Sequence, residues 1–236
     1  MSDYESDAEI PSIGTFTGER DELGRRHGQG RNEFPSGAIF EGAYSAGKRH
    51  GQGFYKWSNG AVYKGNYENN LRNGQGELTC PDGSKFVGEW KDNNKHGVGV
   101  YTYASGDVYD GEWHEDKRQG FGKYTFKLTG EILEGEWVEG KFVKGKRIFP
   151  SGVIYEGAFM MSGLAIEPKG DGAFIFPNGC VQKGTYIVIK NEDEDEDEEE
   201  EDDYESEDED EEKDPFKRPK SPRAKPLPQV QWVPTF

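Results

Sequence analysis

Three of the four histidines begin a repeated tetrapeptide, His-Gly-x-Gly, at His27, His50 and His96. A row of imidazoles could bind a metal ion or transfer protons. In successive hairpins, however, these side chains would lie about 9.6 Å apart, whereas zinc ligands lie about 2 Å from their ion. Other copies of the tetrapeptide begin with Asn73, Gln119 or Lys169. We therefore predict that the histidines are turn residues, with no metal site and no catalytic role.

The other residues with reactive side chains form no recognisable catalytic set. The glycine pairs are not followed by the helix and the Lys-Ser/Thr step of a phosphate-binding loop. Cys80 and Cys180 have neither a CxxC spacing nor a histidine-rich neighbourhood, which argues against a zinc site or a disulfide framework and fits a reducing compartment. We predict a protein that is not an enzyme, with no cofactor and no small-molecule substrate.

Charge is distributed unevenly along the chain. The net charge is -17, but 19 acidic residues lie between Glu192 and Glu212, which leaves 29 basic and 27 acidic residues elsewhere. A nearly neutral body offers no basic groove, so no nucleic-acid partner is expected. The acidic block is expected to stay solvated and disordered, because it has little apolar surface to bury. With no long apolar run and an acidic start, the chain is expected to be soluble and cytosolic.

The order of the segments follows from changes in composition. Only 32% of the residues are hydrophobic, yet there are 33 glycines and 13% aromatic residues, which favours a thin, turn-rich β structure. We expect a disordered acidic N-terminus over residues 1–13, a repeat array over 14–189, an acidic disordered tail over 190–213 and a basic, proline-rich segment over 214–236. Proline spacing in the last segment favours extended, polyproline-type structure.

Eight glycines recur at intervals close to 23 residues, usually with a bulky residue two places before and an aromatic residue two places after. They are Gly18, Gly42, Gly65, Gly88, Gly111, Gly135, Gly157 and Gly184. Most units also carry a two-residue turn signal, such as Asn59-Gly60, for which we expect positive φ at both residues. Each unit is therefore predicted to be a β-hairpin, which gives about sixteen antiparallel strands.

Alternation along the strands predicts one aromatic face and one polar face. Tyr109, Gly111 and Trp113 share the aromatic face. Because glycine contributes no side chain to a sheet, its recurrence beside aromatic residues predicts that a ring lies across each gap. One hairpin alone is too weak to be stable, so the array is expected to depend on contacts between neighbouring units.

This pattern resembles the MORN repeat, which is roughly Tyr-x-Gly-x-Trp, a short loop, His-Gly-x-Gly, and a strand ending in Asp/Asn-Gly. The resemblance covers most of residues 14–189 and implies an all-β fold, an elongated single-layer antiparallel sheet of tandem hairpins with disordered termini. It is least complete in three units. Arg20 and Gln182 stand at aromatic positions, and Lys144-Gly145-Lys146 replaces the tetrapeptide of the sixth unit.

The layout of the chain is similar to that of the MORN proteins of the radial spoke head. Repeats begin near the N-terminus, the string Gly-Lys-Arg-His-Gly-Gln-Gly occupies residues 47–53, and an acidic tail follows the last repeat. The similarity implies a structural scaffold of the cytoplasm and cytoskeleton, in the axoneme of cilia and sperm flagella. It also implies other radial spoke head proteins as partners and contact with the central-pair apparatus. Whether the array forms a homodimer stays open.

Two sets of residues are candidates for partner binding. The aromatic face is expected to serve as internal packing and, where uncovered, as an interaction surface. Its candidate residues are Tyr44, Trp57, Tyr67, Trp90, Tyr101, Trp113 and Trp137. The second set is a C-terminal motif with Trp232 and Phe236, which either docks on a sheet, its own or a partner's, or is a passive tail.

Two other functions stay open from the sequence. Some MORN proteins are associated with phospholipid surfaces, so a membrane-associated adaptor is the first alternative. The nearly neutral body, the acidic tail and the lack of a basic amphipathic helix or lipidation signal argue against it. The second is an acidic, meiotic chromosome-associated protein of germ cells, which only the resemblance suggests. An enzymatic MORN protein is not expected, because the 47 mostly low-complexity residues after position 189 could not organise an active site.

Overall fold

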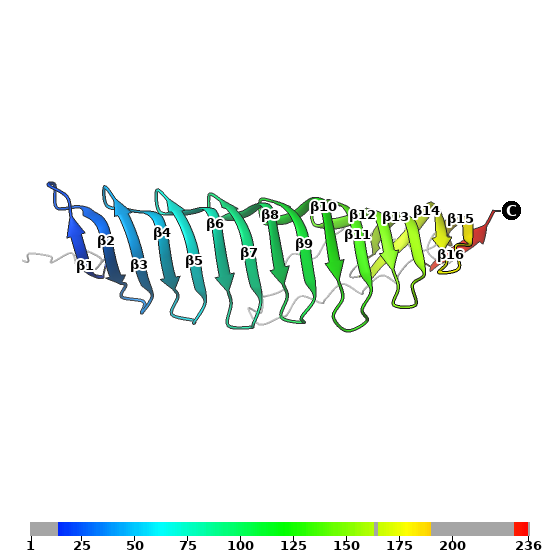
Figure 1. The fold of residues 1–236 in the computed structure, drawn as a ribbon, viewed down its shortest axis with the longest axis horizontal. Helices are drawn as coiled ribbons and strands as arrows, with labels where there is room; N and C mark the ends of the chain where they lie inside the picture. The colour runs from blue at the N-terminus through cyan, green and yellow to red at the C-terminus, as the bar shows by residue number, and fades with distance from the viewer. Residues whose placement is uncertain (1–13, 163–164, 190–228, 236) are drawn as a thin grey trace, which may run out of the picture.

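The computed structural model describes residues 14–162, 165–189 and 229–235. Every regular element in these ranges is a β-strand, and the strands lie side by side in one elongated row (Figure 1). They are β1 (Thr15–Arg20), β2 (Arg26–Glu33), β3 (Ile39–Ser45), β4 (Lys48–Lys56), β5 (Val62–Glu68), β6 (Leu71–Thr79), β7 (Lys85–Lys91), β8 (Asn94–Thr102), β9 (Val108–His114), β10 (Lys117–Thr125), β11 (Ile132–Val138), β12 (Lys141–Ile148), β13 (Ile154–Ser162), β14 (Ala165–Ile175), β15 (Val181–Ile189) and β16 (Gln229–Pro234).

The strands form a single open sheet in which each strand pairs with its neighbours in sequence, from β1 to β16. Every ladder is antiparallel. The predicted all-β, single-layer antiparallel array is therefore confirmed. In the described ranges no helix is present that could span a membrane.

Turns of two kinds alternate between the two long sides of the sheet. On one side, two-residue turns such as Asn69-Asn70 have positive φ at both residues, 49° and 74°. This is the type I′ geometry that matches the twist of paired strands, and asparagine tolerates it better than most residues do. Similar turns occur at residues 46–47, 92–93, 115–116 and 139–140.

The turns on the other side are longer than predicted. In the turn that contains Asn59-Gly60, only Gly60 has positive φ, 91°, so the expectation of positive φ at both residues is wrong. The loop closes with a hydrogen bond from the Trp57 amide to the Ala61 carbonyl. Asn59 instead accepts a hydrogen bond at Oδ1 from the amide of Ala61, 3.0 Å away. Asparagine thus fixes the loop through its side chain, and glycine supplies the one left-handed residue.

A row of glycines crosses the sheet from β1 to β15, each opposite the next in register. Its members are Gly18, Gly30, Gly42, Gly53, Gly65, Gly76, Gly88, Gly99, Gly111, Gly122, Gly135, Gly145, Gly157, Gly172 and Gly184. A Cβ at Gly99 would lie 2.5 Å from Cζ of Phe86, and one at Gly88 would lie 2.8 Å from the same atom. The ring of Phe86 covers both gaps, which confirms the predicted pairing of rings and glycines.

The rings above the glycine row form the core. Phe86 is 1% exposed, and its ring meets those of Trp90 and Trp113 edge-on, with centroids 5.2 and 5.5 Å apart. Edge-to-face contact is a favourable arrangement of two rings. The same contacts recur along the array, so the buried residues form one continuous cluster. It consists of Phe40, Tyr44, Tyr63, Tyr67, Phe86, Trp90, Tyr109, Trp113, Leu133, Trp137, Phe142, Tyr155 and Phe159.

The His-Gly-x-Gly tetrapeptide forms a β-bulge. In β8, Gly97 and Val98 lie between the residue pairs Gly88–Gly99 and Glu89–His96, and Gly97 has a φ of 57°. A bulge with a left-handed glycine bends and twists the strand. β8 thus has three residues, His96 to Val98, between the partners of Gly88 and Trp90, whereas β12, which lacks the tetrapeptide, has only Val143 and Lys144 between the partners of Gly135 and Trp137. The sixth unit therefore keeps its place in the sheet with a bulge one residue shorter.

The sixteenth strand comes from the far end of the chain. β16 pairs with β15 from Ile189 opposite Gln229 to Gly184 opposite Pro234. The ring of Trp232 lies across the position that a Cβ of Gly184 would take, as Phe86 does over Gly99. The sequence left open whether this motif docks on its own sheet, docks on a partner's sheet or is a passive tail. In the structure it docks on its own sheet. The disorder predicted for residues 1–13 and 190–213 concerns residues outside the described ranges.

Candidate interaction surface

In each of five units, one basic residue lies on the aromatic face near the start of the even-numbered strand. Arg49 is opposite Tyr44, and Arg72 is opposite Tyr67. We call this set the cation row: Arg26, Arg49, Arg72, Lys95 and Arg118, on β2, β4, β6, β8 and β10. The row ends at β12, where Phe142 takes the equivalent position opposite Trp137.

The sequence contained a signal for this row. A basic residue immediately precedes the tetrapeptide in five consecutive units, whereas histidine begins the tetrapeptide in only three of them. His27, His50 and His96 themselves lie near the starts of strands rather than in the turns, and the ring of His96 contacts that of His114 at a tilt of 49°, with centroids 5.2 Å apart. In the described ranges, no group of three or more His, Cys, Asp and Glu residues is placed to hold a metal ion.

Each cation-row side chain stacks on the buried rings. The guanidinium carbon of Arg72 is 4.1 Å from the ring centroid of Trp90 and 5.6 Å from that of Tyr63. That of Arg118 is 4.2 Å from the centroid of Trp137. A guanidinium over an indole is worth about 0.5–1 kcal/mol when exposed and about 2 kcal/mol when desolvated. The cations therefore cover the rings and complete the core on its solvent side.

Hydrogen bonds connect each cation to the turn of the following unit. Arg72 donates from Nη2 to the carbonyl of Asn93 over 2.6 Å, and Arg118 donates from Nη2 to that of Gly140 over 2.6 Å. In return, Oδ1 of Asn93 accepts from the amide of Arg72 at 2.9 Å, and the amide of Asn93 donates to the carbonyl of Arg72 at 3.1 Å. Arg72 Nε also donates to Oδ1 of Asn93 at 3.4 Å, so four hydrogen bonds between Arg72 and Asn93 join these neighbouring units.

Most of this positive charge lacks a carboxylate partner among the described residues. Lys95 pairs with Asp116, with 3.0 Å between Nζ and Oδ1. The arginines of the row, Arg26, Arg49, Arg72 and Arg118, form no ion pair with any described residue. Burial lowers the pKa of Arg72, because desolvation disfavours the charged form. An arginine nevertheless stays protonated at neutral pH, so the four arginines carry positive charge without an ion-pair partner among the described residues.

Two depressions lie on the aromatic face beside the row. One, of about 320 Å³, lies between Arg26 and Arg49, and the next, of about 310 Å³, lies between Arg49 and Arg72. Tyr55 lines both, and Trp57 lines the second. Such repeated hollows between cations and rings suit a long, extended ligand better than a compact one.

The structure divides the candidate aromatic residues into two groups. Five rings are at most 6% exposed and belong to the core: Tyr44, Tyr67, Trp90, Trp113 and Trp137. Trp57 and Tyr101 are half-buried and accessible from solvent. Direct binding of a partner therefore stays a prediction for Trp57 and Tyr101, while the other five would act through the surface they support.

The C-terminal candidate motif is only partly described. Trp232 is half-buried, with its ring centroid 5.0 Å from that of Tyr186 and 5.1 Å from that of Phe174. Phe236 lies outside the described residues. In the described chain, Trp232 is therefore part of the packing at the end of the sheet.

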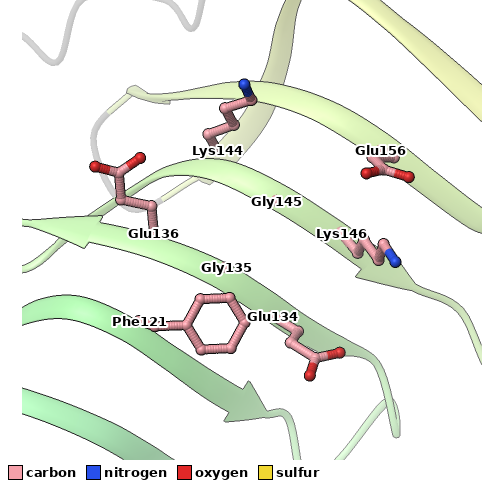
Figure 2. A pocket seen from close by; sticks show the side chains of 8 residues that line it. All are labelled: Phe121, Glu134, Gly135, Glu136, Lys144, Gly145, Lys146 and Glu156. Carbon is pink, nitrogen blue, oxygen red and sulfur yellow. The ribbon is translucent and has the colours of Figure 1, made fainter.

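The opposite, polar face carries charges of both signs in alternate positions. Glu134 lies opposite Lys146, which in turn lies opposite Glu156. Figure 2 shows these side chains, with Glu136 and Lys144, around a depression of about 340 Å³ over two members of the glycine row. Phe121 borders this depression and is 60% exposed. Here each charge has a neighbour of opposite sign, in contrast to the cation row.

A family model for the MORN repeat matches residues 22–39, 40–62, 63–85, 86–108, 109–127 and 134–154, which together make up more than half of the chain. The chain belongs to the MORN repeat family. Four of the matched MORN units begin at the first buried ring of a hairpin, namely Phe40, Tyr63, Phe86 and Tyr109. The cation row lies wholly within the matched MORN units.

Other comparisons add little to this assignment. No curated protein matches the chain. Among solved structures, the SAS-4 (dCPAP) TCP domain of Drosophila melanogaster, in complex with a proline-rich motif of Ana2 (dSTIL), is 11% identical, with a TM-score of 0.44 over 74% of this chain and 92% of that chain. A point mutant of the TCP10 domain of Danio rerio CPAP is 14% identical, with a TM-score of 0.28 over 69% of this chain and 90% of that chain.

Proposed function

We propose that this MORN protein is a non-catalytic scaffold subunit of the radial spoke head of ciliary and flagellar axonemes. It would assemble there with other spoke-head proteins, near the central-pair apparatus, and support ciliary and sperm motility. The layout of the chain, with repeats near the N-terminus followed by an acidic block, is similar to that of radial spoke head protein 1 and supports this role.

The observation that carries the proposal is the single, elongated sheet with two dissimilar faces. Each unit of such an array contacts only its neighbours, so the array presents binding positions at fixed intervals along a line. The aromatic face combines half-buried rings with arginines that have no ion-pair partner among the described residues, whereas the polar face places charges of opposite sign at facing positions. A surface of this kind can hold several protein partners in a fixed order.

Purification of the tagged full-length chain from ciliated cells tests the proposal. We expect other radial spoke head proteins to be recovered with it. The variant Trp57→Ser should lower their recovery, because it removes a half-buried ring beside a depression of the aromatic face. Phe121→Ser, at an exposed ring of the polar face, is the matched control and should leave recovery unchanged.

Two outcomes would contradict the proposal. Recovery of meiotic chromosome proteins in place of spoke-head proteins would favour a germ-cell chromosome-associated role. Flotation of the purified chain with anionic phospholipid vesicles, together with absence from isolated axonemes, would favour a membrane-associated adaptor.

A further inference from the structure

The arginines of the cation row keep hydrogen-bond donors that the described residues do not use. Arg118 makes a single side-chain hydrogen bond, from Nη2 to the carbonyl of Gly140, while a guanidinium carries five N–H donors. One face of the guanidinium lies on the ring of Trp137, and the side chain as a whole is half-buried. A stacked, weakly hydrated guanidinium with free donors is a good receptor for a carboxylate.

The spacing of the row suits an extended acidic chain. Its members stand on alternate strands, so neighbouring cations are about 9.6 Å apart. An extended chain advances about 3.3 Å per residue, so every third residue faces a cation. Between Glu192 and Glu212, 19 of the 21 residues are acidic, so carboxylates are available in almost any register.

The fold places both strand ends that flank this acidic block on the side of the sheet where the row lies. Val181 lies next to the loop that joins β14 to β15, so β15 ends, at Ile189, on the opposite long side of the sheet. β16 begins on that same side, at Gln229 opposite Ile189. The two-residue turns and the cation row lie along this side. The chain between the two strands therefore leaves and returns where the row runs.

The length of the connecting chain limits which cations it can reach. From β15, Arg118 on β10 is about 24 Å away, Arg72 on β6 about 43 Å and Arg26 on β2 about 62 Å, at about 4.8 Å per strand. The 39 residues from 190 to 228 must go out from β15 and return to β16, and they span at most about 130 Å. A round trip to Arg72, past Arg118 and Lys95, takes about 91 Å, whereas one to Arg26 takes about 130 Å and leaves no residue to spare for binding.

We propose that the acidic block from Glu192 to Glu212 binds in an extended form along the cation row of its own chain, over Arg118, Lys95 and Arg72. The block neutralises the row and covers part of the aromatic face. A protein partner that uses this part of the face must displace it. This inference concerns the chain alone and holds whether or not the protein belongs to the radial spoke head.

Carbodiimide cross-linking of the full-length protein can test the contact, because this reagent joins carboxylates to lysine amines that touch them. Lys95 lies in the row, and Lys123, on the polar face of β10, is the matched control at a similar distance from β15. The variant Asp116→Asn releases Lys95 from its ion pair, and it installs the residue type that Asn93 provides in the preceding turn.

In this variant at low salt we expect peptides of residues 192–212 to be joined to Lys95 about tenfold more often than to Lys123, since tethering gives a high local concentration. Accessibility alone would favour Lys123, which is exposed, over Lys95, whose side chain is only 20% exposed. An excess of cross-links at Lys95 therefore reports binding of the block to the row. It should vanish near 1 M salt, where the screening length falls to about 3 Å. Adding Arg72→Gln and Arg118→Gln should also reduce it, while Arg26→Gln should not.

Three results would overturn the proposal. Equal yields at Lys95 and Lys123 would mean that the block prefers neither face. An equal loss of cross-links with Arg26→Gln would contradict the limit on reach. Cross-links found only between isotopically light and heavy copies in a mixed sample would show that the block binds a second copy instead of its own chain.

Discussion

At the scale of single residues, the array depends on the pairing of a glycine with the ring that lies over it. Phe86 covers two members of the glycine row, and the same relation repeats at Phe40 over Gly53. Because the ring occupies the space of the missing side chain, even one methyl group has no room. Glycine here is required by packing, not by an unusual φ, since Gly99 has an ordinary one.

The variant Gly99→Ala should therefore destabilise the protein by about 1–3 kcal/mol, the usual penalty of overpacking a core. Its Cβ would lie 2.5 Å from Cζ of Phe86, which is 1% exposed and cannot move freely. Urea-induced unfolding measures the loss. Val98→Ala, at a side chain that is 58% exposed, is the control and should change stability by less than about 0.5 kcal/mol. Equal effects of the two substitutions would argue against the pairing.

Buried phenols make a second prediction at this scale. Burial raises the pKa of Tyr63 to about 12, and its hydroxyl donates to the carbonyl of Asn66 over 3.1 Å. An unfolded tyrosine titrates near pH 10. The native state thus holds this proton more tightly, so the stabilisation is fully present below about pH 10 and is lost as the pH rises through about 12.

Unfolding free energies measured between pH 9 and pH 12 should fall above pH 10, with the absorbance of tyrosinate rising as the protein unfolds. Tyr63→Phe should show a shallower decline, because its ring cannot ionise. A stability that stays constant up to pH 12 would exclude this contribution.

At the scale of elements, the two-residue turn has two tasks. Its backbone adopts positive φ, and in three of the five turns its second residue also accepts a side-chain hydrogen bond from the preceding unit. Asn93 does both, with a φ of 71° and its Oδ1 at 2.9 Å from the amide of Arg72. Asp116 and Asn70 occupy the same position and accept the same bond, from Lys95 and Arg49.

Substitutions of Asn93 can separate these tasks. Asn93→Asp keeps both and should be nearly neutral. Asn93→Gly keeps the φ and loses the acceptor, which should cost about 0.5–1.5 kcal/mol. Asn93→Ala loses both and should cost about 1–2 kcal/mol more. Thermal unfolding of the three variants gives their order of stability. A glycine variant less stable than the alanine variant would contradict the role of positive φ at Asn93.

At the scale of the whole molecule, each strand pairs only with its neighbours and its rings contact those of nearby strands, so a local change should stay local. Trp232→Ala removes the ring over Gly184 at one end of the sheet. We expect faster amide hydrogen exchange in β15 and β16 and no change in β3 to β8. Val233→Ala, at a neighbouring side chain that is 42% exposed, is the control. Faster exchange throughout the sheet would show cooperativity over the full length.

The sequence predicts the hairpins and their faces well, because both follow from local rules. Alternation of glycine and aromatic residues identifies the strands, and their equal spacing implies equal contacts. The conformations of the two turns were harder to predict. Asn59-Gly60 looks like a two-residue turn, but the loop length depends on which backbone groups pair, and that is decided by the register of both strands.

The interaction surface was predicted less well, for a different reason. Trp90 and Trp137 look exposed in a single-layer sheet, but Arg72 and Arg118 cover them. That cover depends on a residue of the preceding strand, so no pattern within one strand reveals it. The docking of Trp232 is likewise non-local, because its partner strand lies 39 residues earlier, beyond the acidic block.

The unbroken glycine row allows such proteins to change in length by whole hairpins. Since every hairpin meets the next through the same register, duplication or loss of one 23-residue module, such as residues 63–85, leaves equivalent junctions on both sides. Each such event would alter the span of the molecule by a fixed increment of about 9.6 Å. Gene rearrangement can thus lengthen or shorten the array by whole modules, while the contacts between successive hairpins stay the same.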